Sequence, residues 1–256
     1  MQLIFRYILF VFIIGFGSCA NSQNPVIQHM SKVSNLPDVE FYDIAEDSQN
    51  YIWLAANKGL YRYNGKSYKH FSHPQQRGNS LFQLKFDAKN QLWCNNIYGQ
   101  IFYVENDSLK LFYDASKLVN GQLANFEILE NSIRLFTVIG IFDIDKSTKQ
   151  VTEVFKGMCI TNAKDNRSNY TFIINHEGDL ERHRLYKFDN NTKTKILEIT
   201  SSNRIQSPRI FAFKNTVFFT HKSSNENVIY RIDKTKNTPK KVVTPARLKN
   251  ETIYNV

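Results

Sequence analysis

The sequence predicts an all-β fold, a β-propeller of four-stranded blades with five blades complete and the start of a sixth. Three observations support this prediction. One segment recurs after forty residues, each repeat unit holds four short strand-like runs, and an aromatic residue recurs at near-constant spacing through five units. A fixed period of this length with four strands per unit is typical of propeller blades.

The repeat is clearest in the first two units. Asp47–Trp53 recurs as Asp87–Trp93, an offset of 40 residues, and Tyr63 falls on Tyr103 at the same offset. The four apolar runs of the first unit are rich in aromatic and β-branched residues, which favour strands. These runs cover residues 41–45, 51–55, 60–63 and 68–71.

The turns of these units have matching chemistry. Asn50 and Asn90 lie between the first and second runs, where we expect a positive φ that asparagine tolerates well. Asn64-Gly65 is a typical two-residue hairpin sequence. The turn residues therefore agree with the antiparallel strands that the apolar runs predict.

Later units are degenerate but keep the spacing. The aromatic residue at the centre of each third strand recurs at intervals of 41, 40, 44 and 44 residues, as Tyr61, Phe102, Phe142, Tyr186 and Tyr230. A β-sandwich would not explain this spacing, and no apolar stripe of helical period follows residue 25. We expect residues 38–248 to form five antiparallel sheets, with Trp53 and Trp93 at equivalent second-strand positions between neighbouring sheets.

Residues 1–23 have the pattern of a signal peptide. Arg6 supplies a positive flank, residues 7–16 are apolar, and small residues surround Cys19. Ten apolar residues are too few to span a bilayer. Two routes stay open: cleavage shortly after Cys19, or a lipoprotein signal in which Cys19 is lipidated and becomes the mature N-terminus. Both predict export.

Both ends of the remaining chain resemble parts of a repeat unit. His29-Met30-Ser31 resembles His70-Phe71-Ser72, so residues 24–37 are predicted to hold a ring-closing fourth strand and the entry to the first blade. Glu251–Val256 resembles the start of a first strand at Glu40. We therefore expect residues 38–256 to be a partial propeller from a longer protein.

No motif for catalysis, cofactor binding or metal binding is recognisable, and none is predicted. His70 and His73 are near each other but are interpreted as loop residues rather than a metal pair. The segments after Asp47 and Asp87 lack the spacing of calcium loops and are interpreted as hairpin turns. Cys94 and Cys159 lie in different units and are predicted to be core residues rather than a disulfide.

The net charge is +10, with 33 basic and 23 acidic residues. Most lysines are scattered, and only Lys234–Lys241 forms a local cluster, in a predicted hairpin loop that is interpreted as solvated. An excess of positive charge favours anionic ligands or a membrane surface. No basic stripe interleaved with aromatic residues is present, so nucleic acid is not an expected partner.

The first two units resemble the two-component regulator propeller repeats of Bacteroidetes-type sensor proteins. The matching residues are Tyr42–Asp47, then Tyr51–Ala55, then Gly59–Gly65, and the second unit matches up to residue 105. Trp93-Cys94-Asn95-Asn96 departs from the family's run of small residues at this position. From residue 122 on, only the periodicity remains.

The resemblance implies the periplasmic sensor region of a membrane-bound histidine kinase, whose kinase part is absent from this sequence. Its expected partner is a periplasmic ligand, a glycan or an anionic molecule, and the full-length receptor is expected to be a dimer. Contact with the membrane would come only from the absent C-terminal parts or from lipidated Cys19. One alternative is a secreted or lipid-anchored propeller that binds glycans or acts in adhesion. Another is a propeller enzyme, such as a lyase or glycosidase, but no cluster of carboxylates or histidines marks its site.

Overall fold

The computed structural model describes residues 36–242, apart from Val39 and positions 166–167, 178–179, 190–191, 202–204, 214–215 and 224–225. All described sheets belong to one unit, Asp38–Val256. The predicted signal peptide with Cys19, the ring-closing strand at His29–Ser31 and the start of a sixth blade at Glu251–Val256 lie outside the described residues. No helix among the described residues has the length and apolar character needed to cross a membrane.

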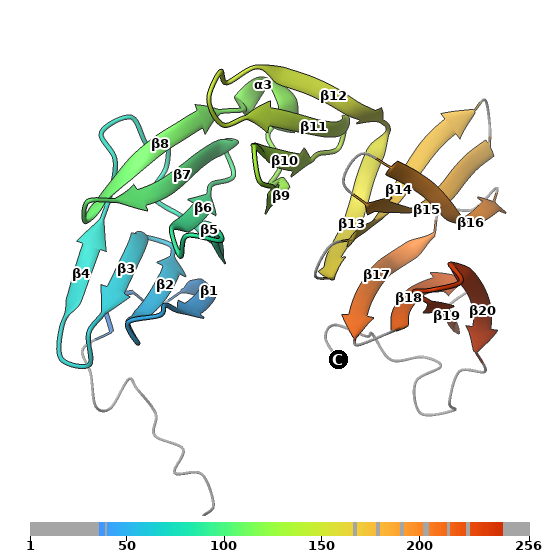
Figure 1. Ribbon diagram of the computed structural model, residues 1–256, viewed down its shortest axis with the longest axis horizontal. Coiled ribbons are helices and arrows are strands. Elements are labelled where there is room, and N and C mark those ends of the chain that lie inside the picture. Colours follow the sequence, from blue (N-terminus) through green and yellow to red (C-terminus); the bar gives the residue numbers. More distant parts are fainter. Residues whose placement is uncertain are drawn as a thin grey trace, which may run out of the picture. The chain divides into compact units, whose positions relative to one another are not determined.

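The described residues form five four-stranded antiparallel sheets, which confirms the predicted class and the number of strands in each unit. Within each sheet the strands follow one another in chain order (Figure 1). We name the sheets A to E. The strands of sheets A to C are β1 (Phe41–Glu46), β2 (Ile52–Ala56), β3 (Gly59–Tyr63) and β4 (Tyr68–Phe71); β5 (Phe82–Phe86), β6 (Leu92–Asn95), β7 (Gln100–Glu105) and β8 (Ser108–Asp114); and β9 (Asn125–Ile128), β10 (Ser132–Phe136), β11 (Gly140–Asp145) and β12 (Val151–Lys156).

Sheets D and E are built from longer strands. A single-turn helix, α3 (Ser116–Val119), lies between sheets B and C. The strands are β13 (Met158–Asp165), β14 (Ser168–Glu177), β15 (Leu180–Asp189) and β16 (Thr192–Ser201); and β17 (Gln206–Phe213), β18 (Thr216–Ser223), β19 (Glu226–Asp233) and β20 (Thr238–Val242).

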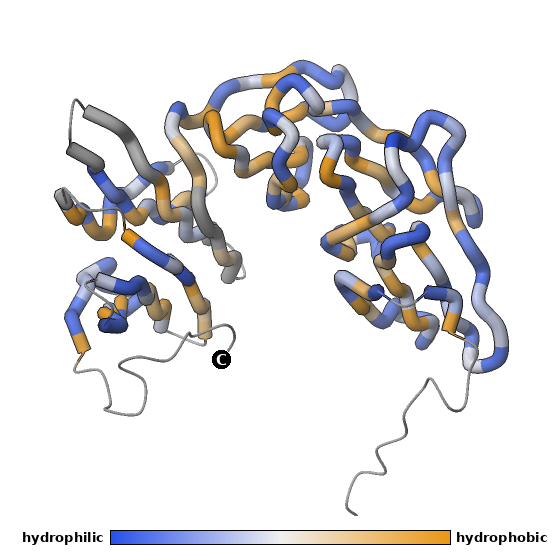
Figure 2. Tube along the Cα trace, turned by 180° about the vertical axis from the view of Figure 1, so that it is seen from behind, coloured by the Kyte–Doolittle hydropathy of each residue, from blue (hydrophilic) through white to orange (hydrophobic). Residues whose placement is uncertain are grey.

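The core lies between consecutive sheets. Alternate residues of a strand point to opposite faces, and hydrophobic and hydrophilic residues are interspersed along the strands (Figure 2). Trp53 and Leu60 of sheet A pack with Leu92 of sheet B, and Trp93 packs with Phe126 of sheet C. Similar clusters join sheet C to sheet D and sheet D to sheet E. Face-to-face packing of successive sheets is the arrangement of propeller blades.

Both tryptophans occupy the predicted positions. Trp53 lies on β2 and Trp93 on β6, and both are buried. The Asp47 carboxylate accepts a hydrogen bond from Trp53 Nε1 at 2.8 Å, and its other oxygen accepts from the backbone N–H groups of Gln49 and Tyr51. The interpretation of this segment as a hairpin turn is confirmed.

The second repeat has the same turn. Asp87 accepts from Trp93 Nε1 at 3.3 Å and from two backbone N–H groups. Asn50 and Asn90 have φ of 62° and 60°, as predicted. Each aspartate therefore fixes the turn and satisfies the buried indole N–H at the same time.

The prediction of a two-residue hairpin at Asn64-Gly65 is wrong. Tyr63 pairs with Tyr68, so Asn64–Ser67 make the connection. The Asn64 side-chain oxygen accepts hydrogen bonds from the backbone N–H groups of Lys66 and Ser67. Asparagine here acts through its side chain, and Gly65 alone has a positive φ, of 90°.

Candidate functional site

The chain connections of sheets A to C place one set of segments at the same end of each sheet. In an antiparallel meander, the turn between the second and third strands lies at the same end as the connection to the next sheet. We call this end the loop face. Its segments are residues 57–58, 72–81, 96–99, 115–124, 137–139 and 157.

Four large apolar side chains are exposed on the loop face. Ile97 and Tyr98 lie in the β6–β7 turn with 43% and 48% of their surface exposed. Leu123, before β9, is 41% exposed, and Ile139, in the β10–β11 turn, is 42% exposed. Exposed apolar side chains that gather on one face of a protein often mark an interaction site.

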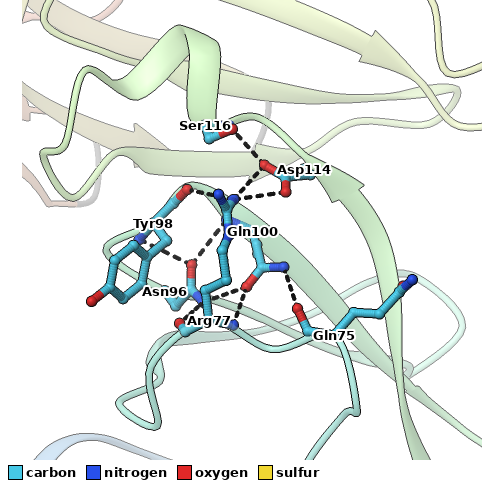
Figure 3. A network of polar contacts seen from close by, with 7 residues as sticks. All are labelled: Gln75, Arg77, Asn96, Tyr98, Gln100, Asp114 and Ser116. Atoms are coloured by element: carbon cyan, nitrogen blue, oxygen red, sulfur yellow. Dashed lines mark hydrogen bonds and ion pairs between the residues drawn. The ribbon is translucent and has the colours of Figure 1, made fainter.

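Two buried amides hold the segment 75–77 against the β6–β7 turn (Figure 3). The Asn96 side-chain oxygen accepts from the backbone N–H groups of Tyr98 and Gln100, at 3.1 and 2.9 Å. The Gln100 side-chain oxygen accepts from the Arg77 N–H at 2.7 Å, and its Nε2 donates to the Gln75 carbonyl at 2.8 Å. Buried polar groups that are fully hydrogen-bonded fix a single local conformation.

Arg77 extends the same network toward α3. Its Nη2 lies 2.6 and 2.7 Å from the two carboxylate oxygens of Asp114 and donates to the Tyr98 carbonyl at 3.3 Å (Figure 3). Partial burial acts to raise the pKa of Asp114, but hydrogen bonds from Ser116 and the charge of Arg77 outweigh it and lower this pKa. The carboxylate therefore stays ionised, and the ion pair with Arg77 persists at neutral pH.

The Tyr98 ring lies directly against Gly78. A Cβ atom at Gly78 would come within 2.5 Å of the ring, and the φ of this residue is +67°. The Arg77 guanidinium is 5.9 Å from the ring centroid. Tyr98 is thus an exposed aromatic ring with a fixed orientation, beside amide and guanidinium groups. Such a surface suits ligands that combine a flat apolar face with hydrogen-bonding groups.

The rings of both histidines considered in the sequence form hydrogen bonds within the fold. His70 Nε2 is 2.9 Å from the Lys58 carbonyl, and His73 Nδ1 accepts from the Gln75 N–H. Within the described part of the chain, no three His, Cys, Asp or Glu residues are grouped so as to hold a metal ion. The prediction that the chain carries no metal or cofactor site is not tested by this observation.

The cysteine prediction is confirmed for the described residues. Cys94 is buried between sheets A and B, and Cys159 packs partly buried against the cluster between sheets C and D. Both are free thiols, and burial raises the pKa of each. They are small core residues, as expected.

Sequence reasoning missed the network of the loop face. Its signal was the departure from the family pattern at Asn95-Asn96. Asn95 Nδ2 donates to the Ala124 carbonyl at 2.7 Å, and Asn96 holds the β6–β7 turn. Two buried asparagines stand where the family pattern has small residues, and both tether segments of the loop face.

No protein-family model matches the chain, and no curated protein matches its sequence. Among solved structures it is similar to the extracellular domain of BT4673 from B. thetaiotaomicron, described once as a one-component and once as a hybrid two-component system. The TM-score is 0.58 for both, the identities are 17% and 16%, and the matches cover 79% and 83% of this chain. They cover only 29% and 30% of the BT4673 chains.

A third similar structure is YCF48 bound to a D1 peptide. Its TM-score is 0.55 at 14% identity, and the match covers 84% of this chain and 70% of that chain. The fold is propeller-like. At these identities the likeness concerns the fold, and the chain spans less than a third of the BT4673 chains that it matches.

Proposed function

We propose that this chain is the extracytoplasmic, propeller-like sensor domain of a two-component signalling receptor. It binds a ligand and passes the signal to a histidine kinase across the membrane, and it acts as a binding domain rather than an enzyme. The observation that carries the proposal is the similarity to the extracellular domain of BT4673. The repeat motif of residues 36–105 and the signal-like pattern of residues 1–23 support the same assignment.

The proposed ligand site is the loop face of sheets B and C. Tyr98 and Ile97 offer apolar contact area, and the network around Asn96 and Gln100 holds that area in one orientation before any ligand binds. A site ordered in advance loses less conformational entropy on binding. A glycan fits this chemistry because sugar rings combine an apolar face with hydroxyl groups. The ligand is proposed to be a periplasmic glycan.

A second candidate is a secreted or lipid-anchored propeller that binds glycans in adhesion. The same exposed Tyr98 favours it, because glycan contact requires no kinase. The two candidates differ in the size and location of the gene product. A receptor is a large membrane protein, whereas the adhesion module is released or held by a lipid at Cys19.

The experiment is to add an epitope tag before Asp38 at the chromosomal gene and to purify the product from the source cells. Mass spectrometry then gives the complete mass and the mature N-terminus, and incubation with labelled ATP measures autophosphorylation. We expect a membrane protein well above 29.9 kDa that phosphorylates itself on histidine. A product near that mass, in the medium or lipidated at Cys19, would contradict the receptor proposal and support the second candidate.

A further inference from the structure

Sheet A presents a row of three side chains toward sheet B. Trp53, Arg62 and Lys69 are directly opposite one another on β2, β3 and β4. Asp107, in the β7–β8 turn of sheet B, receives both cations: Arg62 Nη1 lies 2.8 Å from its carboxylate, and Lys69 forms a second ion pair. The hydrogen bond from Lys69, with the charge of Arg62, lowers the pKa of Asp107. The two cations of this row therefore bind the acidic turn of the next sheet.

Sheet E repeats this row. Phe218, Arg231 and Lys240 are directly opposite one another on β18, β19 and β20. Tyr230 and Ile232 pack toward sheet D, so Arg231 projects to the other face of the strand. Each member of the sheet A row thus has its counterpart in sheet E: an aromatic residue, an arginine and a lysine in the same order.

Among the residues that the structure describes, no carboxylate forms an ion pair with the row in sheet E. Arg231 and Lys240 are exposed, and neither has an ion-pair partner within the described parts of the chain. Two like charges directly opposite in a sheet are unfavourable without a counterion. Two apolar residues of the same face are half-buried: Phe218, opposite Arg231, and Ile229, two positions before it on β19. We call this the outer face of sheet E.

We infer that the outer face of sheet E is the docking surface for a further four-stranded sheet of the same polypeptide. The turn between the third and fourth strands of that sheet places an aspartate or glutamate against Arg231 and Lys240, as Asp107 lies against Arg62 and Lys69. The contact continues the mode of packing already present between sheets A and B. This inference rests on the proposed function, in which the chain belongs to a longer receptor.

Charge argues against a second copy of this chain as the occupant. A second copy would offer the side of its sheet A that faces away from sheet B, and the turn between β3 and β4 of this sheet is Asn64–Ser67. This turn holds no acidic residue and carries Lys66. Lys66 would approach Arg231 and Lys240, and the like charges would repel each other. The row in sheet E is complementary to an acidic turn and not to sheet A.

The test measures the accessibility of the outer face. A cysteine at Ile229, the counterpart of the fully buried Leu60, is made in the 256-residue chain and in the natural gene product purified from source cells. A bulky maleimide reagent then labels both proteins, and unmodified proteins give the background of the native cysteines. Lys241→Cys is the matched control, because this exposed residue lies on the same hairpin but pairs with Tyr230, which packs toward sheet D.

We expect Ile229→Cys to react at least about tenfold more slowly in the natural product than in the 256-residue chain, because burial in a packed interface leaves only opening motions for access. Lys241→Cys should react equally in both. Adding Arg231→Asp and Lys240→Asp should restore fast labelling at position 229 in the natural product.

Equal labelling of Ile229→Cys in the two proteins would overturn the inference. The lysines of β20 would then serve to prevent this exposed edge strand from pairing with another chain. Slow labelling of the 256-residue chain that depends on its concentration would show a second copy as the occupant and would overturn it equally. The mass and kinase activity of the same natural product test the proposed function separately. A large kinase with an open position 229 would therefore refute the docking surface alone.

Discussion

Sheets A and B differ from sheets D and E in how they reach the same four-stranded architecture. In sheets A and B the strands have four to seven residues, and an aspartate in the turn between the first and second strands holds the buried tryptophan. Most strands of sheets D and E have eight to ten residues, and no tryptophan is present. There the sheets are joined through aromatic contacts such as Phe172 with Phe219, whose centroids are 4.6 Å apart.

The aspartates in the turns also differ between the earlier and the later sheets. Asp145 in sheet C and Asp233 in sheet E lie at the end of the third strand, where each accepts hydrogen bonds from side-chain and backbone groups of the following turn. These bonds lower the pKa of both carboxyl groups. The aspartate of the earlier sheets fixes a turn and a core residue together, whereas the later aspartates fix only an exposed turn. The earlier sheets are therefore more strongly determined by local sequence.

The largest expected effect is the loss of a tryptophan. Trp53→Ala should lower the free energy of unfolding by about 3–5 kcal/mol, because it removes a large buried aromatic side chain. Phe219→Ala should cost a similar amount through the cluster between sheets D and E. Chemical denaturation followed by circular dichroism measures both. A loss below about 0.5 kcal/mol for Trp53→Ala would refute the packing described for sheets A and B, since ordinary surface substitutions stay within that range.

The next effect separates the two kinds of turn. Asp47→Ala should cost about 1–3 kcal/mol, because the buried Trp53 Nε1–H loses its acceptor. Asp233→Ala should cost less, because its hydrogen bonds are all exposed. Asp47→Asn is the control, since it keeps one side-chain acceptor oxygen. Equal losses for the two alanine variants would contradict the distinction between the turns.

Acidification should destabilise sheets D and E. Burial lowers the pKa of His221, and the positive charges of the nearby His183 and Lys241 lower it further, while the backbone of Lys222 acts in the opposite direction. The unfolded chain then binds a proton that the folded chain does not, so stability falls as the pH drops below the unfolded pKa of about 6.5.

The loss from His221 is at most about 1.4 kcal/mol per pH unit, until the folded pKa is reached. Hydrogen exchange should show weaker protection of β18 and β19 at pH 5.5 than at pH 7. His221→Phe keeps a ring against Tyr230 and should remove this part of the pH dependence. An unchanged pH dependence in His221→Phe would refute the role of His221.

The smallest effect on stability belongs to the loop face. Tyr98→Ala should change the free energy of unfolding by less than about 0.5 kcal/mol, because the ring is half-exposed and leaves no buried cavity. Asn96→Ala should cost more, since it breaks the buried network that fixes the β6–β7 turn. The melting temperatures of the two variants check this order. A larger loss of stability for Tyr98→Ala than for Asn96→Ala would show that the Tyr98 ring stabilises the fold.

The sequence predicted the repeat and the strand order because each unit repeats its local chemistry. Asp47, Asn50 and Trp53 carry that information within seven residues, and the structure confirms the predicted turn, the positive φ of Asn50 and the second-strand position of Trp53. The loop-face network was not predictable in the same way. Gln100 contacts Gln75 and Arg77, more than twenty residues away, and neither residue has a counterpart in the repeat. The shift of the turn at Asn64 depends on the hydrogen bonds that its side-chain oxygen accepts from the Lys66 and Ser67 backbone N–H groups, which the dipeptide alone does not specify.

The loop face is proposed to sense a ligand for a signalling receptor. Genome-wide transcripts in source cells grown on a panel of polysaccharides test this role most directly. Three strains are compared: one with the unmodified gene, one lacking it, and one carrying Tyr98→Ala with Ile97→Ser. We predict that deletion abolishes the response to one polysaccharide and that the double variant, at normal protein level, does the same. A double variant that responds like the unmodified strain, while the deletion does not, would contradict the claim.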